Sequence, residues 1–438
     1  MFIFFPAIPW QFYMQRPQRL GMALADKGET VLYLCPTTNR SLFPDLPQKN
    51  EGAFRIRPLS IRVFELLVLV DETINIHEMK MPHRSVTRIA ETIQKLLVFN
   101  PVLFIQHPAW VSVLEAGHFS GLISSYDCMD DAGSFPDAPK ELLEEAEITL
   151  LEKVSKVFAT SKTLFKKLEP YCKDKIFLLR NGVSISAFNH INDADTNKNN
   201  SSVLINKTCH VGYVGSIRSW LDSRIISTLL TDFPDITISL VGKLESDFNI
   251  EPHERLLFLG EKQASEIPAL ISEFKVCLIP FHINQLTQAT NPVKLYEYFA
   301  LGKPVVSTNL PEVAEFDNIV YISDSVSDFS SKLSQALSEE DNDARRLARI
   351  EVAKNNTWDK RANELLDILA EVRSSNRNFI TLPDDSIHPF WNEIVSKSFM
   401  EELNYLKIQH MESISENDLH WRRELGRLLG EIKGTTAV

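Results

Sequence analysis

The feature that most constrains the fold is an alternation of short apolar runs with longer segments of helical period, which occurs twice along the 438 residues. This alternation is typical of βα units wrapped around a parallel sheet. In the first half it predicts strands at Phe2–Phe5, Thr30–Leu34, Val102–Gln106, Leu122–Tyr126, Lys156–Thr160 and Lys175–Leu179. In the second half it predicts strands at Val211–Val214, Ile236–Val241, Leu256–Leu259, Val276–Pro280, Val305–Ser307 and Val320–Ile322. Helices are predicted between them, for example at Pro17–Lys27, Ser85–Leu97 and Pro139–Val154.

A polar stretch rich in Asn, Asp and Ser divides the two series, and it has almost nothing to bury. We therefore predict an α/β protein with two Rossmann-like domains, in which the carboxyl ends of the two sheets face one another across a cleft. The predicted parts are a first domain, a linker, a second domain, a helix returning towards the first domain, and a helical extension. They cover residues 1–190, 191–203, 204–357, 358–375 and 376–438.

The extension contains two amphipathic segments, each with an apolar stripe at spacings of three and four residues. Trp391 and Phe399 belong to the first stripe, and we expect them to pack on this chain. The second stripe contains Trp421, and we leave it open between self-packing and contact with a second copy of the chain. A tryptophan stripe needs a cover in either arrangement.

Composition narrows the cellular setting and the partners. The formal net charge is −12, which argues against nucleic acid as the main partner. Five scattered cysteines without metal-like spacing are typical of reduced thiols in the cytoplasm. The richest apolar run, Phe64–Val70, is far shorter than the roughly 20 residues of a membrane helix. We expect a cytoplasmic protein whose contact with the inner face of a membrane, if it has one, is peripheral.

The most informative segment begins at Asn291-Pro-Val-Lys and runs to Gly302. Asn291 is a good N-cap, Pro292 suits the first helical position, and Gly302 is placed to end the helix. Lys294 then lies in the first turn, which is unfavourable for a cation unless an anion binds there. Glu297 follows on the same face, and its carboxylate can accept two hydroxyl hydrogen bonds from a ribose diol. Alone, this pair also fits an ordinary solvent-facing helix.

The segment resembles the donor-site motif of bacterial GT-B glycosyltransferases of the group 1 kind, most closely the teichuronic-acid-type members. The resemblance runs from residue 1 to about residue 372, with further motifs in the expected order. These are Phe158-Ala-Thr-Ser161, Arg180-Asn-Gly-Val183, Gly212-Tyr-Val-Gly-Ser216, Trp220-Leu-Asp222 and Thr357-Trp-Asp-Lys-Arg361. It implies a transferase that moves a sugar from a nucleotide-sugar donor to a glycan or lipid-linked acceptor in cell-surface polysaccharide assembly. It also implies that neither a cofactor nor a metal is needed.

The resemblance assigns Glu297 to the second glutamate of the family's Glu-x7-Glu motif, which holds the donor's ribose. The first glutamate would fall at position 289, where this chain has Ala289. This departure puts the contacts of that position with the donor sugar in doubt. Thr290 and Asn291 are the polar residues that offer contacts instead.

The donor's diphosphate is expected at the helix start, near Pro292 and Lys294. A Gly-x-x-Gly turn ending at Gly215 allows a backbone to approach a phosphate closely. Arg218 follows the turn, and a guanidinium group binds phosphate through two parallel hydrogen bonds. A Gly-x-x-Gly pattern by itself is more often just a turn.

The family's glycine-rich first loop is replaced here by the segment Pro9–Arg19. Trp10 and Arg16 in this segment are expected on the acceptor side. Arg16 precedes a proline at a helix start, where an anion would stabilise it. A solvated arginine is the equally acceptable alternative.

Acid–base candidates follow two predicted strands of the first half. His107 follows Val102–Gln106, and Asp127, Asp130 and Asp131 follow Leu122–Tyr126. A general base must lie within hydrogen-bond reach of the acceptor hydroxyl, and neighbouring carboxylates raise one another's pKa. We predict Asp131 as the base, then Asp130, then His107, with Asp127 on the acceptor side. The alternative is that these aspartates cap turns or are solvated. Retention and inversion of the anomeric configuration both remain open.

Two other functions are compatible with the same sequence. A nucleotide-sugar epimerase shares the fold but needs no acceptor, and the Trp10–Arg19 loop argues mildly against it. A degenerate transferase serving as a scaffold would fit Ala289 and the helical extension. Binding of a nucleoside diphosphate separates this scaffold from the two enzymes.

Overall fold

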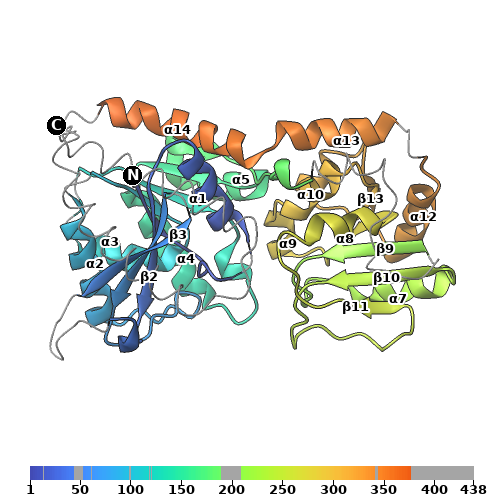
Figure 1. The fold of residues 1–438 in the computed structure, drawn as a ribbon, viewed down its shortest axis with the longest axis horizontal. Helices are drawn as coiled ribbons and strands as arrows, with labels where there is room; N and C mark the ends of the chain where they lie inside the picture. Colours follow the sequence, from blue (N-terminus) through green and yellow to red (C-terminus); the bar gives the residue numbers. More distant parts are fainter. Residues whose placement is uncertain are drawn as a thin grey trace, which may run out of the picture.

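The computed structural model describes residues 1–375 except 13, 44–52, 61, 98–99, 118, 120, 189–208 and 341–343. These residues form two α/β domains that lie side by side (Figure 1). Each domain is built on a sheet of mainly or entirely parallel strands, so the predicted α/β class is confirmed. The predicted linker 191–203 and extension 376–438 lie outside the described residues.

The first sheet has the strand order β3-β4-β2-β1-β5-β6-β7-β8. Its strands are β1 (Phe2–Phe5), β2 (Val31–Thr37), β3 (Phe54–Ser60), β4 (Val63–Leu69), β5 (Val102–Ile105), β6 (Ser124–Cys128), β7 (Lys156–Ala159) and β8 (Ile176–Leu178). The six predicted strands are confirmed, whereas the antiparallel pair β3–β4 was not predicted. Pro58 in β3 reads as a strand breaker, and it is tolerated because β3 is the edge strand.

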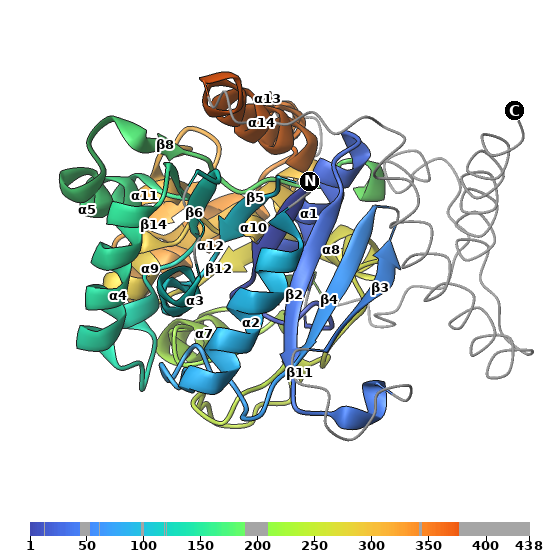
Figure 2. The same cartoon turned by 90° about the vertical axis from the view of Figure 1, so that its left-hand side faces the viewer.

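Helices cover both faces of the first sheet, as Figure 2 shows. They are α1 (Arg16–Asp26), α2 (His83–Lys95), α3 (Val111–Ala116), α4 (Lys140–Lys153) and α5 (Lys162–Cys172). One apolar core joins the sheet to α2, α3, α4 and α5. The other joins the opposite face to α1 and to the last helix of the described chain, α14 (Trp358–Ser375). Burial on both faces explains why the strands are continuous apolar runs.

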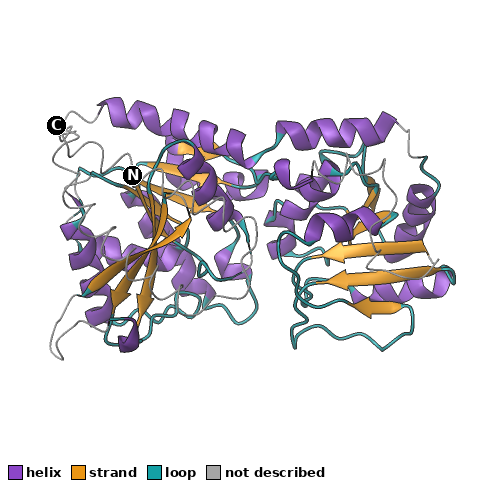
Figure 3. Ribbon diagram, in the orientation of Figure 1, coloured by secondary structure: helices purple, strands orange, loops and turns teal. Residues whose placement is uncertain are grey.

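The second sheet has the strand order β11-β10-β9-β12-β13-β14, and its registered pairs are all parallel. Its strands are β9 (Cys209–Val214), β10 (Ile236–Val241), β11 (Leu256–Phe258), β12 (Val276–Ile279), β13 (Val305–Thr308) and β14 (Tyr321–Ser323). The helices are α7 (Ser223–Asp232), α8 (Ile267–Glu273), α9 (Gln285–Ala289), α10 (Val293–Ala300), α11 (Pro311–Ala314) and α12 (Val326–Leu337). Figure 3 shows β9 and β10 with their carboxyl ends towards the first domain.

The last two helices run along one side of both domains (Figure 1). α13 (Ala344–Asn355) lies over the second domain, and α14 returns over the first. Trp358, Ala362, Leu365 and Leu369 of α14 are buried in the core shared with α1 and β1. The chain therefore crosses between the domains a second time, immediately before Trp358.

Charged side chains also join the domains directly. Arg180, after β8, donates from Nε to Glu312 at 2.8 Å and from Nη2 to Glu315 at 2.7 Å. Lys162 at the start of α5 forms an ion pair with Glu315 at 2.6 Å, and its backbone N–H donates to Glu312. These contacts fix α11 of the second domain against α5 of the first. Among the described residues, no helix is long and apolar enough to cross a membrane.

Candidate active site

Two glycines lie side by side at the carboxyl ends of β9 and β10. Gly215 and Gly242 have φ angles of +138° and +142°, which L side chains rarely adopt. A Cβ on Gly242 would lie 2.1 Å from the carbonyl oxygen of Gly215. The two backbones are therefore packed against each other, and their N–H groups donate to the carbonyl oxygens of Val241 and Gly260 at 2.8 and 2.9 Å. The donor-binding role of Gly215 stays a prediction. Gly242 was missed, although the sequence signal is the same: a glycine directly after an apolar strand.

Lys294, in the first turn of α10, lies beside Gly215. A Cβ on Gly215 would be 3.0 Å from its Cε and 3.1 Å from its Nζ. The ammonium lies 4.9 Å from the ring centroids of both Tyr213 and Phe281, within the range of cation–π attraction. It has no hydrogen-bond acceptor among the described residues. Burial lowers the pKa of Lys294 to about 8, although Glu297 opposes the shift.

Glu297 and Arg19 complete a group of charges without firm partners. Burial raises the pKa of Glu297, while the charges of Arg19 and Lys294 oppose that rise. The Glu297 carboxylate accepts no hydrogen bond within the described part of the chain. Arg19 comes from α1 of the first domain, and within the described residues its side chain makes one hydrogen bond, from Nη1 to Ser184 Oγ at 3.5 Å. Arg19 was not predicted, although it stands three residues after Arg16 and so faces nearly the same side of α1.

Arg16 meets an anion, but the anion is a protein carboxylate. Its Nη2 and Nε donate to Asp127 at 2.7 and 3.0 Å, and both residues are almost fully buried. Its Nη1 donates at 3.2 Å to the carbonyl oxygen of Arg180 and to Asn181 Oδ1. Gln106 Nε2 also donates to Asp127, to Oδ2 at 3.0 Å. The structure therefore corrects the acceptor-side roles predicted for Arg16 and Asp127, because the two side chains are committed to each other.

Asn291 also has a different role from the one predicted. Helix α10 begins at Val293 with Pro292 at the N-cap, so Asn291 lies outside the helix and does not cap it. Its Oδ1 accepts from the backbone N–H of Asn181 at 3.0 Å, and its Nδ2 donates to Glu312 at 2.8 Å. Its carbonyl oxygen accepts from Asn181 Nδ2 at 2.7 Å. Asn291 thus bridges the domains, and its buried side chain is not free for a donor sugar.

The residues before Asn291 are directed inwards as well. Thr290 Oγ1 donates to the carbonyl oxygen of Leu286 and so closes the short helix α9. Ala289, where the resemblance places a glutamate, is buried against the core of the first domain. The predicted donor contact through the side chain of Thr290 is therefore corrected: its hydroxyl is used within the chain.

Arg218 and Trp10 keep partly exposed positions. Arg218 Nε donates to Asp247 at 3.3 Å, and its guanidinium lies over the ring of Trp220 at 5.3 Å. Trp10 packs edge-on against Tyr33, with 5.2 Å between ring centroids. Their donor and acceptor roles stay predictions.

The aspartates after β6 are ranked differently by geometry than by sequence. Asp131 accepts from Lys167 at 2.9 Å, from Ser134 at 2.8 Å and from Gln285 of the second domain at 2.8 Å. Burial alone would raise its pKa, but these partners, Lys167 above all, lower it. Asp131 is therefore a committed carboxylate, and the prediction that it is the first-choice base is corrected.

Asp130 has the opposite character. Its carboxylate accepts no hydrogen bond within the described residues. Burial raises the pKa of Asp130 to about 6; Arg16 opposes the rise, and Asp131 and Asp127 add to it. A carboxylate with a pKa near the working pH is the better proton acceptor. Asp130 thus replaces Asp131 as the base candidate.

His107 is held as a neutral hydrogen-bond donor. Its Nδ1 accepts from the backbone N–H of Ala109 at 3.3 Å, which assigns the proton to Nε2. Burial lowers its pKa to about 3, and the neighbouring His77 ring, 5.1 Å away, adds to the shift. A ring with such a low pKa is a weak proton acceptor, and the role of His107 as a base stays a prediction.

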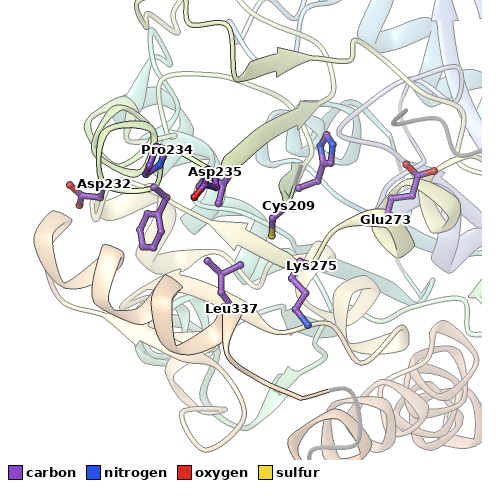
Figure 4. A pocket seen from close by; sticks show the side chains of 10 residues that line it. Cys209, Asp232, Pro234, Asp235, Glu273, Lys275 and Leu337 are labelled. Carbon is purple, nitrogen blue, oxygen red and sulfur yellow. The ribbon is translucent and has the colours of Figure 1, made fainter. Parts of the chain in front are cut away.

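A hollow of about 540 Å³ lies elsewhere, at the amino ends of β9, β10 and β12 (Figure 4). Cys209, Phe233, Glu273 and Lys275 are among its lining residues. Ligands of doubly wound sheets bind at the carboxyl ends of the strands. The hollow is therefore at the wrong end of the sheet to belong to the candidate site.

Comparison with known proteins agrees with the motifs. Residues 218–367 match the family described as "Glycosyl transferase-like". TuaH of Bacillus subtilis (strain 168), provisionally described as a teichuronic acid biosynthesis glycosyltransferase, is 23% identical over 255 residues. That match covers 53% of this chain, and the chain spans 63% of the length of this curated relative.

Solved structures show the same fold. A sucrose-phosphate synthase from Thermosynechococcus elongatus superposes with a TM-score of 0.63 at 14% identity, over 82% of this chain and 93% of the other. HepE of Anabaena, solved in complex with UDP and glucose, superposes with a TM-score of 0.59 at 14% identity, over 84% of this chain and 99% of the other. The predicted GT-B fold is confirmed.

The Arg16–Asp127 pair generates a stability prediction. Asp127→Ala leaves the Arg16 guanidinium buried without its counter-charge, which typically costs about 3–5 kcal/mol in the free energy of unfolding. Urea denaturation followed by circular dichroism measures this loss. Glu144→Ala is the matched control, because Glu144 forms an exposed pair with Lys140 and should change stability little. Equal stability of the two variants would show that the buried pair does not stabilise the fold.

Proposed function

We propose that this chain, which has the GT-B fold and matches a glycosyltransferase family model over residues 218–367, transfers a sugar from a nucleotide-sugar donor to a glycan or lipid-linked acceptor. We place this reaction in cell-surface polysaccharide assembly, as the description of TuaH suggests. In the step proposed, the bond between the sugar's anomeric carbon and the diphosphate breaks, and the nucleoside diphosphate leaves with the electron pair. The acceptor oxygen bonds to that carbon, and its proton passes to Asp130.

One observation carries the proposal: Lys294 and Glu297 are half-buried charges that have no hydrogen-bond partner among the described residues, and Lys294 packs on Gly215 at the carboxyl end of β9. Burying charged groups is costly unless a partner or ligand satisfies them. A cation in the first turn of a helix suits a diphosphate, and a carboxylate suits a ribose diol. Lys294 would also offset the charge that develops on the leaving group.

The alternatives fit less well. A degenerate scaffold has no need to keep Lys294 and Glu297 unpaired. An epimerase would use the same donor groups but gives no role to an acceptor base such as Asp130. We further propose that transfer needs neither metal nor cofactor. A peripheral membrane contact and an oligomer formed through residues 376–438 stay predictions.

The donor site is tested by nucleoside diphosphate binding. A thermal-shift series with UDP, GDP, ADP and dTDP should show stabilisation by one of them. Ligand at roughly one hundred times its Kd adds about 2.7 kcal/mol. Glu297→Gln should raise the Kd of that nucleotide about tenfold or more, because the hydrogen bonds to a charged acceptor are weakened. An unchanged Kd in calorimetry would remove Glu297 from the donor site.

The acid–base assignment predicts a bell-shaped pH dependence of kcat/KM. Asp130 must be ionised to accept a proton, so the rate should rise as pH increases through about 6. Lys294 must be protonated to stabilise the leaving group, so the rate should fall as pH increases through about 8. Asp130→Asn should lower transfer by roughly 10²–10⁴-fold and remove the acidic limb.

Asp131→Asn is the matched comparison for Asp130→Asn. It weakens the ion pair with Lys167, so its main effect should be on the free energy of unfolding rather than on the shape of the pH profile. If Asp131→Asn instead removes the acidic limb and Asp130→Asn leaves it intact, the sequence-based ranking was right.

A further inference from the structure

We propose that Arg19 is a ligand of the donor's diphosphate, contributed by the first domain opposite Lys294 of the second. This inference rests on the proposed function and deepens it, because it assigns a second cation to the same phosphates. The diphosphate is then held from both domains at once.

The packing brings the starts of α1 and α10 together. Arg16 in the first turn of α1 donates to Asn181, and Asn181 exchanges two hydrogen bonds with Asn291 directly before α10. Val293, the first residue of α10, packs against the core that contains α1. Arg19 follows Arg16 by three residues, about one turn of α1, and Lys294 is the second residue of α10. The two cations therefore extend from adjoining helix starts.

Neighbouring arginines show what a committed guanidinium looks like here. Arg16 is paired with Asp127, and Arg180 with Glu312 and Glu315. Arg19 has instead a single 3.5 Å contact with the hydroxyl of Ser184, a neutral group. It is half-buried, and burial lowers its pKa, so its charge is poorly solvated. A guanidinium carries several donors, and most of those of Arg19 have no acceptor in the part of the chain that the structure describes.

Glu297 does not form an ion pair with the Arg19 guanidinium. Arg19 acts on Glu297 electrostatically, yet no hydrogen bond joins the two side chains, since neither has a contact beyond those given above. Two cations and one carboxylate leave a net positive charge in a half-buried place. A diphosphate supplies the missing negative charge, and a guanidinium can bind its oxygens with two parallel bonds. Glu297 stays available for hydroxyl groups.

The test compares a nucleoside diphosphate with its nucleoside, which lacks the phosphates. Calorimetry on the full chain measures both Kd values, using whichever of UDP, GDP, ADP and dTDP the unmodified protein binds. Arg19→Gln should raise the Kd of the diphosphate about tenfold or more and leave that of the nucleoside unchanged. Arg19→Lys keeps the positive charge but not the two parallel donors of the guanidinium, and it should recover part of the lost affinity for the diphosphate. Arg84→Gln, at an exposed arginine of α2, is the matched control and should change neither Kd.

Two results would overturn the inference. An unchanged Kd of the diphosphate in Arg19→Gln would show that Arg19 does not touch the phosphates. An equal rise in the Kd of the nucleoside and of the diphosphate would show that Arg19 acts by positioning Glu297 and does not bind the phosphates. Circular dichroism identifies a variant that fails to fold, and Arg19→Lys then decides by the same ratio of Kd values. If the unmodified protein binds none of the four diphosphates, the proposed function itself fails.

Discussion

The buried guanidinium of Arg16 is the interaction on which the arrangement of the two domains depends. It joins α1 to the end of β6 through Asp127, and to the segment that follows β8 through Arg180 and Asn181. Asn181 then holds Asn291, and with it the start of α10. Because these groups are buried, each would cost free energy without its partner, so the set forms together or not at all. The geometry of the donor helix relative to the first domain follows from this chain of contacts.

The sequence was sufficient for the fold because its signals are local. Apolar runs and helical period predicted twelve strands. Of the missed pair, β3 is interrupted by arginines and Pro58, whereas β4 lies in the apolar run Phe64–Val70 and was missed although its signal is strong. The site was predicted in part. Lys294 and Glu297 stand on one helix, where spacing alone fixes their common face. Arg16 was expected to meet an anion, but sequence gives no means of finding that this anion is Asp127, which lies 111 residues away.

The same limit explains the other corrections. Asn291 is of a residue type that often caps helices, yet its contacts with Asn181 and Glu312 exist only after the domains dock. Asp130 and Asp131 are indistinguishable as a sequence pair. Lys167 and Gln285 distinguish them, because both donate to Asp131, whereas the Asp130 carboxylate has no hydrogen-bond partner among the described residues. Lys167 of α5 and Gln285 of the second domain lower the pKa of Asp131 against the effect of its burial, whereas burial raises the pKa of Asp130.

The contacts between the domains differ in how readily they can break. The bonds between Asn181 and Asn291 are buried, so separating them without replacement partners is costly. The Arg180–Glu315 and Lys162–Glu315 pairs are partly exposed, and water can replace them at little cost. A relative rotation of the domains therefore meets least resistance if it turns about Asn181 and Asn291 and slides the outer pairs. Such a rotation changes the distance from Asp130 to Lys294 while the start of α10 stays attached to the first domain.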